Sequence, residues 1–159
     1  MGLLTVSIKE ELTLNGFDRG SLNTVSISGV TQSFNRIVTC PANGGAGTTE
    51  TAIAVFRDLV TTSDGAINDA DAKYTRVTNL DSTNSVSIAL QLAVTGTASA
   101  SKVIAFSLEP GKSLILNKVN NGVGADDDGT AVPTLEHVEK IIAEVRVNSD
   151  IQIEVFIAS

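Results

Sequence analysis

The stretch SVSIALQLAV, from Ser85 to Val94, alternates two kinds of side chain without a break. Every second residue from Val86 onward is Val, Ile or Leu, and the residues between them are Ser, Ala and Gln. Because successive side chains of a β-strand point to opposite faces, this period of two predicts a strand with one buried face. The stretch therefore indicates a β-protein, and the rest of the chain is consistent with it.

The same alternation returns near the end of the chain, from Ile151 to Ile157. The segment from Ile141 to Val147 is also β-branched and alternating, and Asn148 to Asp150 have the residue types of a turn. We predict that these two segments pair as a hairpin.

The residues Gly111-Lys112-Ser113 raise the question of a nucleotide-binding P-loop, which ends in the same three residues. A P-loop needs a glycine five positions earlier, where this chain has Phe106, and it needs a helix after the serine. The residues that follow here are Leu-Ile-Leu, which predict a strand. Pro110-Gly111 suits a type II turn, so we predict a hairpin between strands at 104–108 and 113–116.

The first part of the chain alternates in the same way from Val6 onward, and Asn15-Gly16 is a strong turn signal. A change of register at Glu10-Glu11 predicts a β-bulge. Residues 1–14 have two interpretations. They form either an N-terminal arm that adds a strand to a neighbouring subunit, or an ordinary edge strand.

The chain has 159 residues and shows no internal repeat and no second domain. About eight to ten strands can be recognised, many of them at the spacing typical of a sandwich or barrel. The segment from Thr134 to Val145 could be a helix or a strand. We expect at most one helical turn at Leu135–Lys140, after which the segment continues as a strand. The predicted fold is a single all-β domain over residues 1–159, an antiparallel β-sandwich or jelly-roll-like domain with at most one short helix.

The charge balance excludes some classes of partner. The formal net charge is −7, which argues against electrostatic binding to nucleic acid or to an anionic membrane. No apolar run approaches about 18 residues, the length that a membrane span requires. The opening MGLLTVSIKEE lacks the pattern of a signal peptide, so we expect a soluble protein folded in a cytoplasm.

Few residues are candidates for chemistry. The single cysteine, Cys40, forms no intrachain disulfide, and we predict a buried inert thiol, because His137 is the only imidazole that could serve as its base. The glycines of NGGAGTTE, Asn43 to Glu50, lack the Gly-x-Gly-x-x-Gly spacing and predict a flexible loop. One histidine and one cysteine provide neither a catalytic triad nor a zinc site.

Some acidic residues are candidates for cation ligands or for acid–base pairs. Asp69-Ala70-Asp71 and Asp126-Asp127-Asp128-Gly129 have carboxylates that suit calcium, but they lack EF-hand spacing, and solvated loops are favoured. The pair Glu10-Glu11 is expected to point to opposite strand faces, and the pair Glu136 and Glu139 to lie on an exposed turn. We therefore assign no catalytic, cofactor-binding or metal residue, expect no cofactor, and expect no enzyme.

Four phrases occur in a suggestive order: VSIKEELTLNGFDRGSLNTVSISGV, KYTRVTNLDSTNSVSIALQL, FSLEPGKSLIL and DIQIEVFIAS. This order resembles small virion proteins of tailed bacteriophages. In such proteins a strand ending in TNLD, a strand beginning at TNSV and a Pro-Gly hairpin recur in a compact β-sandwich. The resemblance covers most of the chain, and its motifs are structural rather than catalytic.

The resemblance implies a capsid decoration or cement subunit that stabilises a phage head by bridging capsid subunits. Its partners would be the major capsid protein or other virion proteins. It would act as a homo-oligomer, with a trimer favoured, on the capsid surface after assembly in the host cytoplasm. Two alternatives stay open: a head–tail connector or tail component, and a calcium-dependent carbohydrate-binding module. The second is disfavoured because the chain has only five Phe and one Tyr to serve both a core and a sugar platform.

Overall fold

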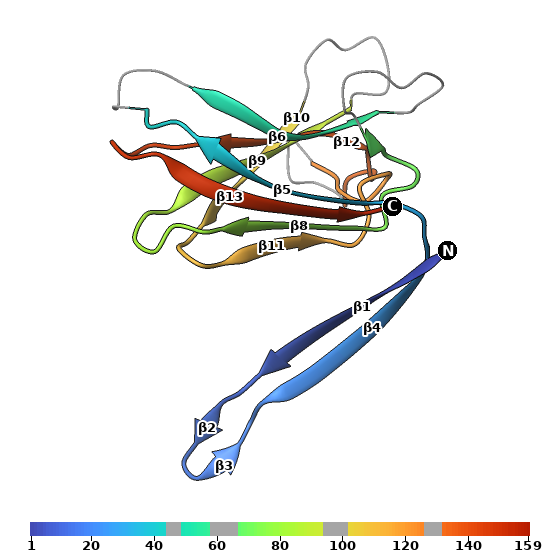
Figure 1. Ribbon diagram of the computed structural model, residues 1–159, viewed down its shortest axis with the longest axis vertical. Coiled ribbons are helices and arrows are strands. Elements are labelled where there is room, and N and C mark those ends of the chain that lie inside the picture. The colour runs from blue at the N-terminus through green and yellow to red at the C-terminus, as the bar shows by residue number, and fades with distance from the viewer. Residues whose placement is uncertain (44–48, 58–66, 94–101, 126–131) are drawn as a thin grey trace.

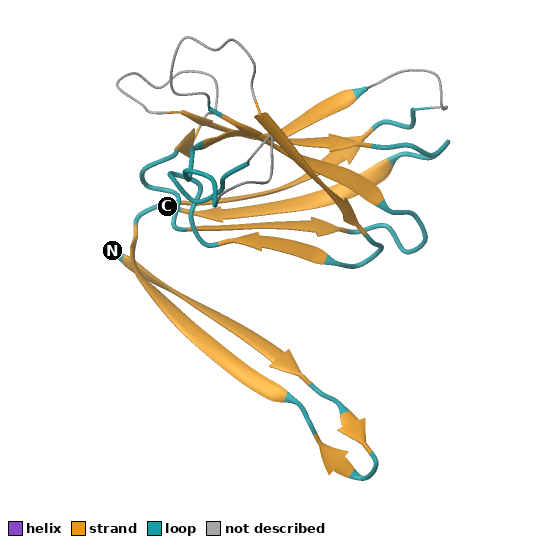
Figure 2. Cartoon of the chain, turned by 180° about the vertical axis from the view of Figure 1, so that it is seen from behind, coloured by secondary structure: helices purple, strands orange, loops and turns teal. Residues whose placement is uncertain are grey.

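The computed structural model describes residues 1–43, 49–57, 67–93, 102–125 and 132–159. Within these ranges every regular element is a β-strand and there is no helix (Figure 2). Two sheets face each other, and a ribbon formed by the first 30 residues projects away from them (Figure 1). The prediction of an all-β sandwich is confirmed. Residues 135–140 contain no helical turn, since a strand begins at Val138.

One sheet has five strands in the order β10-β9-β12-β6-β7, and the other has four in the order β11-β8-β13-β5. All neighbours are antiparallel except the short pair β6–β7. The strands of the first sheet are β6 (Glu50–Arg57), β7 (Ile67–Asn68), β9 (Val86–Leu92), β10 (Lys102–Leu108) and β12 (Val138–Glu144). Those of the second are β5 (Ser33–Cys40), β8 (Tyr74–Asn79), β11 (Ser113–Leu116) and β13 (Ile151–Ala158).

The strands pair as though one long hairpin had been rolled up between the two sheets. β5 pairs with β13, β6 with β12, β8 with β11, and β9 with β10, so that the pairs run inward from the outer strands. Successive pairs alternate between the four-stranded and the five-stranded sheet. This arrangement of eight strands in two layers is a jelly roll, with β7 as a short addition.

Two predicted hairpins are in fact connections that cross from one sheet to the other. The turn at Pro110-Gly111 forms as expected, because the Lys112 amide donates to the Glu109 carbonyl at 3.0 Å and Gly111 has a φ of 69°. Its two strands, however, pair with different partners, β10 with β9 and β11 with β8. The predicted pairing of residues 141–147 with the last strand is wrong for the same reason, since β12 and β13 lie in different sheets.

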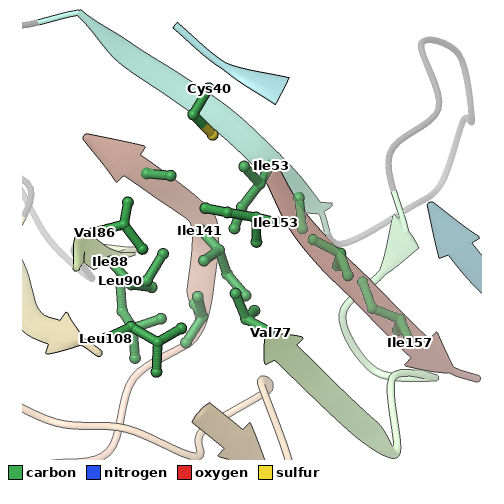
Figure 3. Packing of buried hydrophobic residues seen from close by; sticks show 14 of the residues in the cluster. Cys40, Ile53, Val77, Val86, Ile88, Leu90, Leu108, Ile141, Ile153 and Ile157 are labelled. Carbon is green, nitrogen blue, oxygen red and sulfur yellow. The ribbon is translucent and has the colours of Figure 1, made fainter. Parts of the chain in front are cut away.

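The core lies between the two sheets and comes mainly from every second residue of the strands (Figure 3). The prediction that Val86–Leu92 forms a strand with one buried face is confirmed, while Val94 lies outside the described residues. Burial of each such side chain contributes about 1.5–3 kcal/mol. The largest fully buried side chains are those of Phe56, Ile53, Ile88, Leu90, Leu92, Ile141, Ile151, Ile153, Ile157, Val77, Val86 and Val119.

A single buried amide holds two of the crossing connections at one end of the sandwich. Asn79, the last residue of β8, is fully buried. Its Nδ2 donates to the carbonyls of Asn84 at 2.9 Å and Leu108 at 3.0 Å, and its Oδ1 accepts from the Asp81 amide at 2.9 Å. Its own carbonyl accepts from the Gly111 amide at 3.1 Å. The β8–β9 connection is thereby tied to the β10–β11 connection.

Candidate functional site

The first 30 residues form a two-stranded ribbon, the arm, which stands outside the sandwich (Figures 1 and 2). Asn15 and Gly16 form its turn with φ values of 52° and 79°, as the Asn-Gly signal predicted. No strand of the arm pairs with a described strand of either sandwich sheet, so residues 1–14 are not an edge strand of the sandwich. The arm consists of β1 (Gly2–Glu10), β2 (Thr13–Leu14), β3 (Phe17–Asp18) and β4 (Ser21–Val30).

The arm keeps one register over most of its length. The Leu14–Phe17 pair at the tip continues the register of the Glu10–Ser21 pair, with no residue inserted between them. The bulge predicted at Glu10-Glu11 is therefore wrong, and the strand pairing is only interrupted there. Because the register is constant, every second residue stays on the same face from the base of the arm to its tip.

One face of the arm carries apolar side chains at its base and at its tip, with Glu10, Ser21 and Asn23 on the same face between them. The opposite face mixes hydroxyl side chains with Leu3, Lys9 and Leu22, and there the hydroxyls of Ser7 and Thr24 lie 3.1 Å apart. At the tip Leu12, Leu14 and Phe17 are 53%, 54% and 66% exposed. The register assigns to the apolar face Leu4, Val6, Ile8, Leu12 and Leu14 of the outgoing strand and Phe17, Val25 and Ile27 of the returning strand.

The base of the arm is fixed to the four-stranded sheet. Lys73 Nζ donates to the Gly29 carbonyl, and the amides of Thr31 and Gln32 donate to the Ser159 carbonyl at 2.6 and 2.9 Å. Gly29 has a φ of 71°, a conformation that favours glycine. The arm therefore leaves the sandwich at a defined point, beside the end of β13.

A cleft of about 400 Å³ separates the base of the arm from the outer face of the four-stranded sheet. Tyr74 lies on this face yet is only 6% exposed, and its ring meets Phe156 edge-on with centroids 6.1 Å apart. A second cleft of about 520 Å³ adjoins the first over Arg76 and Phe156. The first cleft is lined by Val6, Ile8, Asn23, Val25 and Ile27 of the arm and by Lys73, Tyr74, Ile115 and Asn117 of the sandwich.

Another candidate site is a cleft of about 490 Å³ over β6, β9 and β12, with Arg57 and Lys140 in its lining. Asp69 Oδ2 lies 2.7 Å from His137 Nδ1, but the ring nitrogen is not aligned for a hydrogen bond. Asp69 is 4% exposed, and its Oδ1 has no hydrogen-bond partner. The assignment of Asp69 to a solvated loop is therefore wrong. Across the described ranges no three His, Cys, Asp or Glu residues gather as a metal site would require.

The structure separates the two residues considered for thiol chemistry. Cys40 is 1% exposed and belongs to the core, as predicted, and burial raises the pKa of its thiol. His137 contacts Asp69 instead. Ser113 begins β11, and its hydroxyl lies 2.8 Å from that of Thr78, so the Gly-Lys-Ser residues run into a strand, as predicted.

The acidic candidates fall in different places. Glu136 is only partly exposed, and its carboxylate lies 3.9 Å from Lys102 Nζ, whereas Glu139 is exposed. The expectation of an exposed pair is therefore wrong for Glu136, because residue 136 forms a bridge with Val123. Residues 126–129 and the glycines at 44, 45 and 47 lie outside the described residues.

Comparison of the chain with protein-family models, curated proteins and solved structures finds no match. Among the described residues there is no helix suited to crossing a membrane. Among the described residues, the arm and the cleft at its base are the strongest candidates for a contact with a partner, because their apolar side chains are exposed together.

Proposed function

We propose that the protein is a structural protein of a phage virion, a capsid decoration or cement subunit that stabilises the head by bridging capsid subunits. The observation that carries the proposal is the arm, whose apolar tip is not covered by any described part of its own chain. An isolated two-stranded ribbon is marginally stable in water, and an exposed apolar patch of this kind marks a protein contact. The arm therefore needs a protein partner.

The two parts of the molecule suit a bridging role. The sandwich has its own buried core, so it folds around that core without help from the arm. At about 3.3 Å per residue, the arm reaches on the order of 40 Å, well beyond the body that carries it. The jelly roll is common among capsid proteins, which supports the proposal as an analogy of fold. A subunit that binds only intact shells stabilises them by mass action.

Electron microscopy and reconstitution test this proposal. Purified protein added to phage heads that lack it is expected to appear as exterior density and to raise the temperature at which the heads open. Density at the neck or tail would replace the decoration role by a connector or tail role. Absence of the protein from every part of purified particles would overturn the proposal.

A matched pair of variants ties this result to the arm. Leu14→Asn removes an apolar side chain from the tip, and Thr13→Asn introduces the same residue on the opposite face of the same short strand. We expect the first variant to lose head binding by tenfold or more and the second to retain it. Equal binding by both variants would show that the apolar face of the arm is not the contact.

A further inference from the structure

We infer that the cleft over β6, β9 and β12 binds a neutral saccharide through hydrogen bonds. The cleft lies on the outer face of the five-stranded sheet, where Arg57 and Lys140 alternate with the core residues Phe56 and Ile141. The arm leaves the sandwich beside the other sheet, on the far side from this cleft (Figure 1). The inference therefore concerns a second surface and does not depend on the proposed function.

Four charged side chains line the cleft without pairing with one another. They are two cations and two carboxylates, Arg57, Lys140, Asp69 and Glu139. Each cation has a carboxylate beside it along the backbone, because the Asp69 amide donates to the Arg57 carbonyl at 3.1 Å and Glu139 precedes Lys140. Within the described residues, neither cation has a carboxylate oxygen within 4.0 Å. Their hydrogen-bonding capacity is therefore available to a ligand.

The two cations lie close enough to contact one small molecule. Lys140 pairs with Val55, so Arg57, two residues further along β6, is its diagonal neighbour on the same face. Diagonal neighbours in an antiparallel pair are about 7–8 Å apart, within reach of long side chains. The cleft volume of about 490 Å³ falls in the range of about 300–1,000 Å³ that is typical of small-molecule sites.

One wall of the cleft holds polar atoms that lack a hydrogen-bond partner. The Asp69 side chain is 5% exposed, and among the described residues nothing donates to its Oδ1. His137 Nδ1 makes no aligned hydrogen bond, although it lies 2.7 Å from Asp69 Oδ2. Buried polar groups without a partner cost stability, and a ligand hydroxyl can supply one because it both donates and accepts. The His137 side chain is 32% exposed, so the imidazole can contact such a ligand.

The mixture of charges favours a neutral ligand that carries several hydroxyl groups. An anion would meet Asp69 and Glu139, and a cation would meet Arg57 and Lys140. A hydroxyl can donate to a carboxylate and accept from a cation at the same time, so the adjacent hydroxyls of a sugar ring use both signs. In the described lining the only Phe, Tyr or Trp is Phe56, which is 2% exposed and leaves no ring open for stacking. We therefore expect a weak complex, with a dissociation constant on the order of 1 mM.

Nuclear magnetic resonance of the purified protein tests the inference, because the imidazole signals of this chain belong to His137 alone. Glucose, galactose and mannose are added separately to about 50 mM, well above the expected dissociation constant, with EDTA present to remove divalent cations. We expect at least one of the three sugars to shift the His137 signals saturably. Acetate and inorganic phosphate, added in the same way, show whether the cleft instead binds anions.

Matched variants connect the shift to the cleft. Asp69→Asn keeps the shape of the side chain and removes its charge, and Asp71→Asn makes the same change at an exposed position of the same turn, outside the lining. We expect the first variant to weaken sugar binding tenfold or more and the second to leave it unchanged. Lys140→Gln, compared with the exposed control Lys112→Gln, repeats the test on the outer face of the sheet. Thermal melting of each variant shows that the sandwich is folded before affinities are compared.

Three results would overturn the inference. The first is the lack of a saturable shift with all three sugars. The second is sugar binding that is equal in Asp69→Asn and Asp71→Asn and also equal in Lys140→Gln and Lys112→Gln. The third is saturable binding of acetate or phosphate without binding of any sugar, which would make the cleft an anion site. Each of these results leaves the head-binding test of the arm unaffected.

Discussion

The arm and the sandwich are built from the same alternation of apolar and polar residues, and they differ in what covers the apolar face. In β9 the Val, Ile and Leu side chains from Val86 to Leu92 are at most 2% exposed, because the second sheet packs on them. In β1, Ile8 is 48% exposed, and at the tip Phe17 is 66% exposed. The comparison teaches that alternation specifies a strand with an apolar face, but not whether the covering surface belongs to the same chain.

The largest difference is expected between apolar truncations in the two regions. Ile153→Ala empties a fully buried position of β13 and is expected to lower the free energy of unfolding by about 3–4 kcal/mol. Leu22→Ala in the arm, where the side chain is 67% exposed, is expected to change it by less than about 0.5 kcal/mol. Urea unfolding at low protein concentration measures both. Similar losses for the two variants would show that the arm is part of the cooperative core.

The next largest effect compares a turn of the sandwich with the turn of the arm. Asn79→Ala leaves the Asn84 and Leu108 carbonyls without their donor and is expected to lower the free energy of unfolding by about 2 kcal/mol. Asn15→Ala, at a φ of 52° in the arm, strains only the ribbon and should leave the unfolding of the sandwich unchanged. Chemical denaturation followed by circular dichroism measures both variants. If Asn79→Ala left the free energy of unfolding unchanged, this would contradict the conclusion that Asn79 ties the two connections together.

A smaller effect of opposite sign is expected inside the sandwich. The Thr75 hydroxyl is buried with no hydrogen-bond partner, so Thr75→Val, which keeps the shape, should raise the free energy of unfolding by about 1 kcal/mol. The control is Thr78→Val on the outer face, which loses the 2.8 Å contact with the Ser113 hydroxyl and should give no gain. Equal shifts in melting temperature for both variants would argue against this account.

The smallest effect is a dependence on pH at the β8–β9 connection. Backbone hydrogen bonds from Asn84 and Thr83 lower the pKa of Asp81 below 3.8, its value when unperturbed. Because the folded pKa is the lower one, the carboxylate stabilises the fold above pH 3.8, and this contribution disappears as the pH falls through the folded pKa. Asp81→Asn should therefore flatten the fall in melting temperature from about pH 5 to about pH 2. If the melting temperatures of the variant and the parent fell equally with pH, this role of the Asp81 carboxylate would be contradicted.

Sequence reasoning predicted the fold class and the main core strand because both follow from local alternation. It did not predict which strands pair, because a turn such as Pro110-Gly111 has the same chemistry whether it closes a hairpin or crosses between sheets. The length of the arm could have been predicted in part, since Asn15-Gly16 lies between two alternating segments that match in register. Local sequence could not predict that no described sheet covers these segments, because this depends on the whole fold.

The sites that sequence reasoning missed depend on contacts between distant segments. Asp69 follows β7 and His137 precedes β12, and no motif spacing links them. The acidic loop around Asp69 predicts a solvated carboxylate, yet the Asp69 side chain is buried beside an imidazole. The cleft at the base of the arm needs Tyr74 and Ile115 from two different strands of the sandwich. Only the rolled topology places them opposite the arm.

The rolled pairing also sets an order in which parts of the molecule can fold. β5 pairs with β13, so the four-stranded sheet cannot be completed until the last strand has been synthesised. The arm needs only contacts within the first 30 residues, and hairpins of this kind form in about 1–10 μs, whereas sheets with distant pairings take milliseconds to seconds. During synthesis the apolar face of the arm is therefore exposed before the core is enclosed.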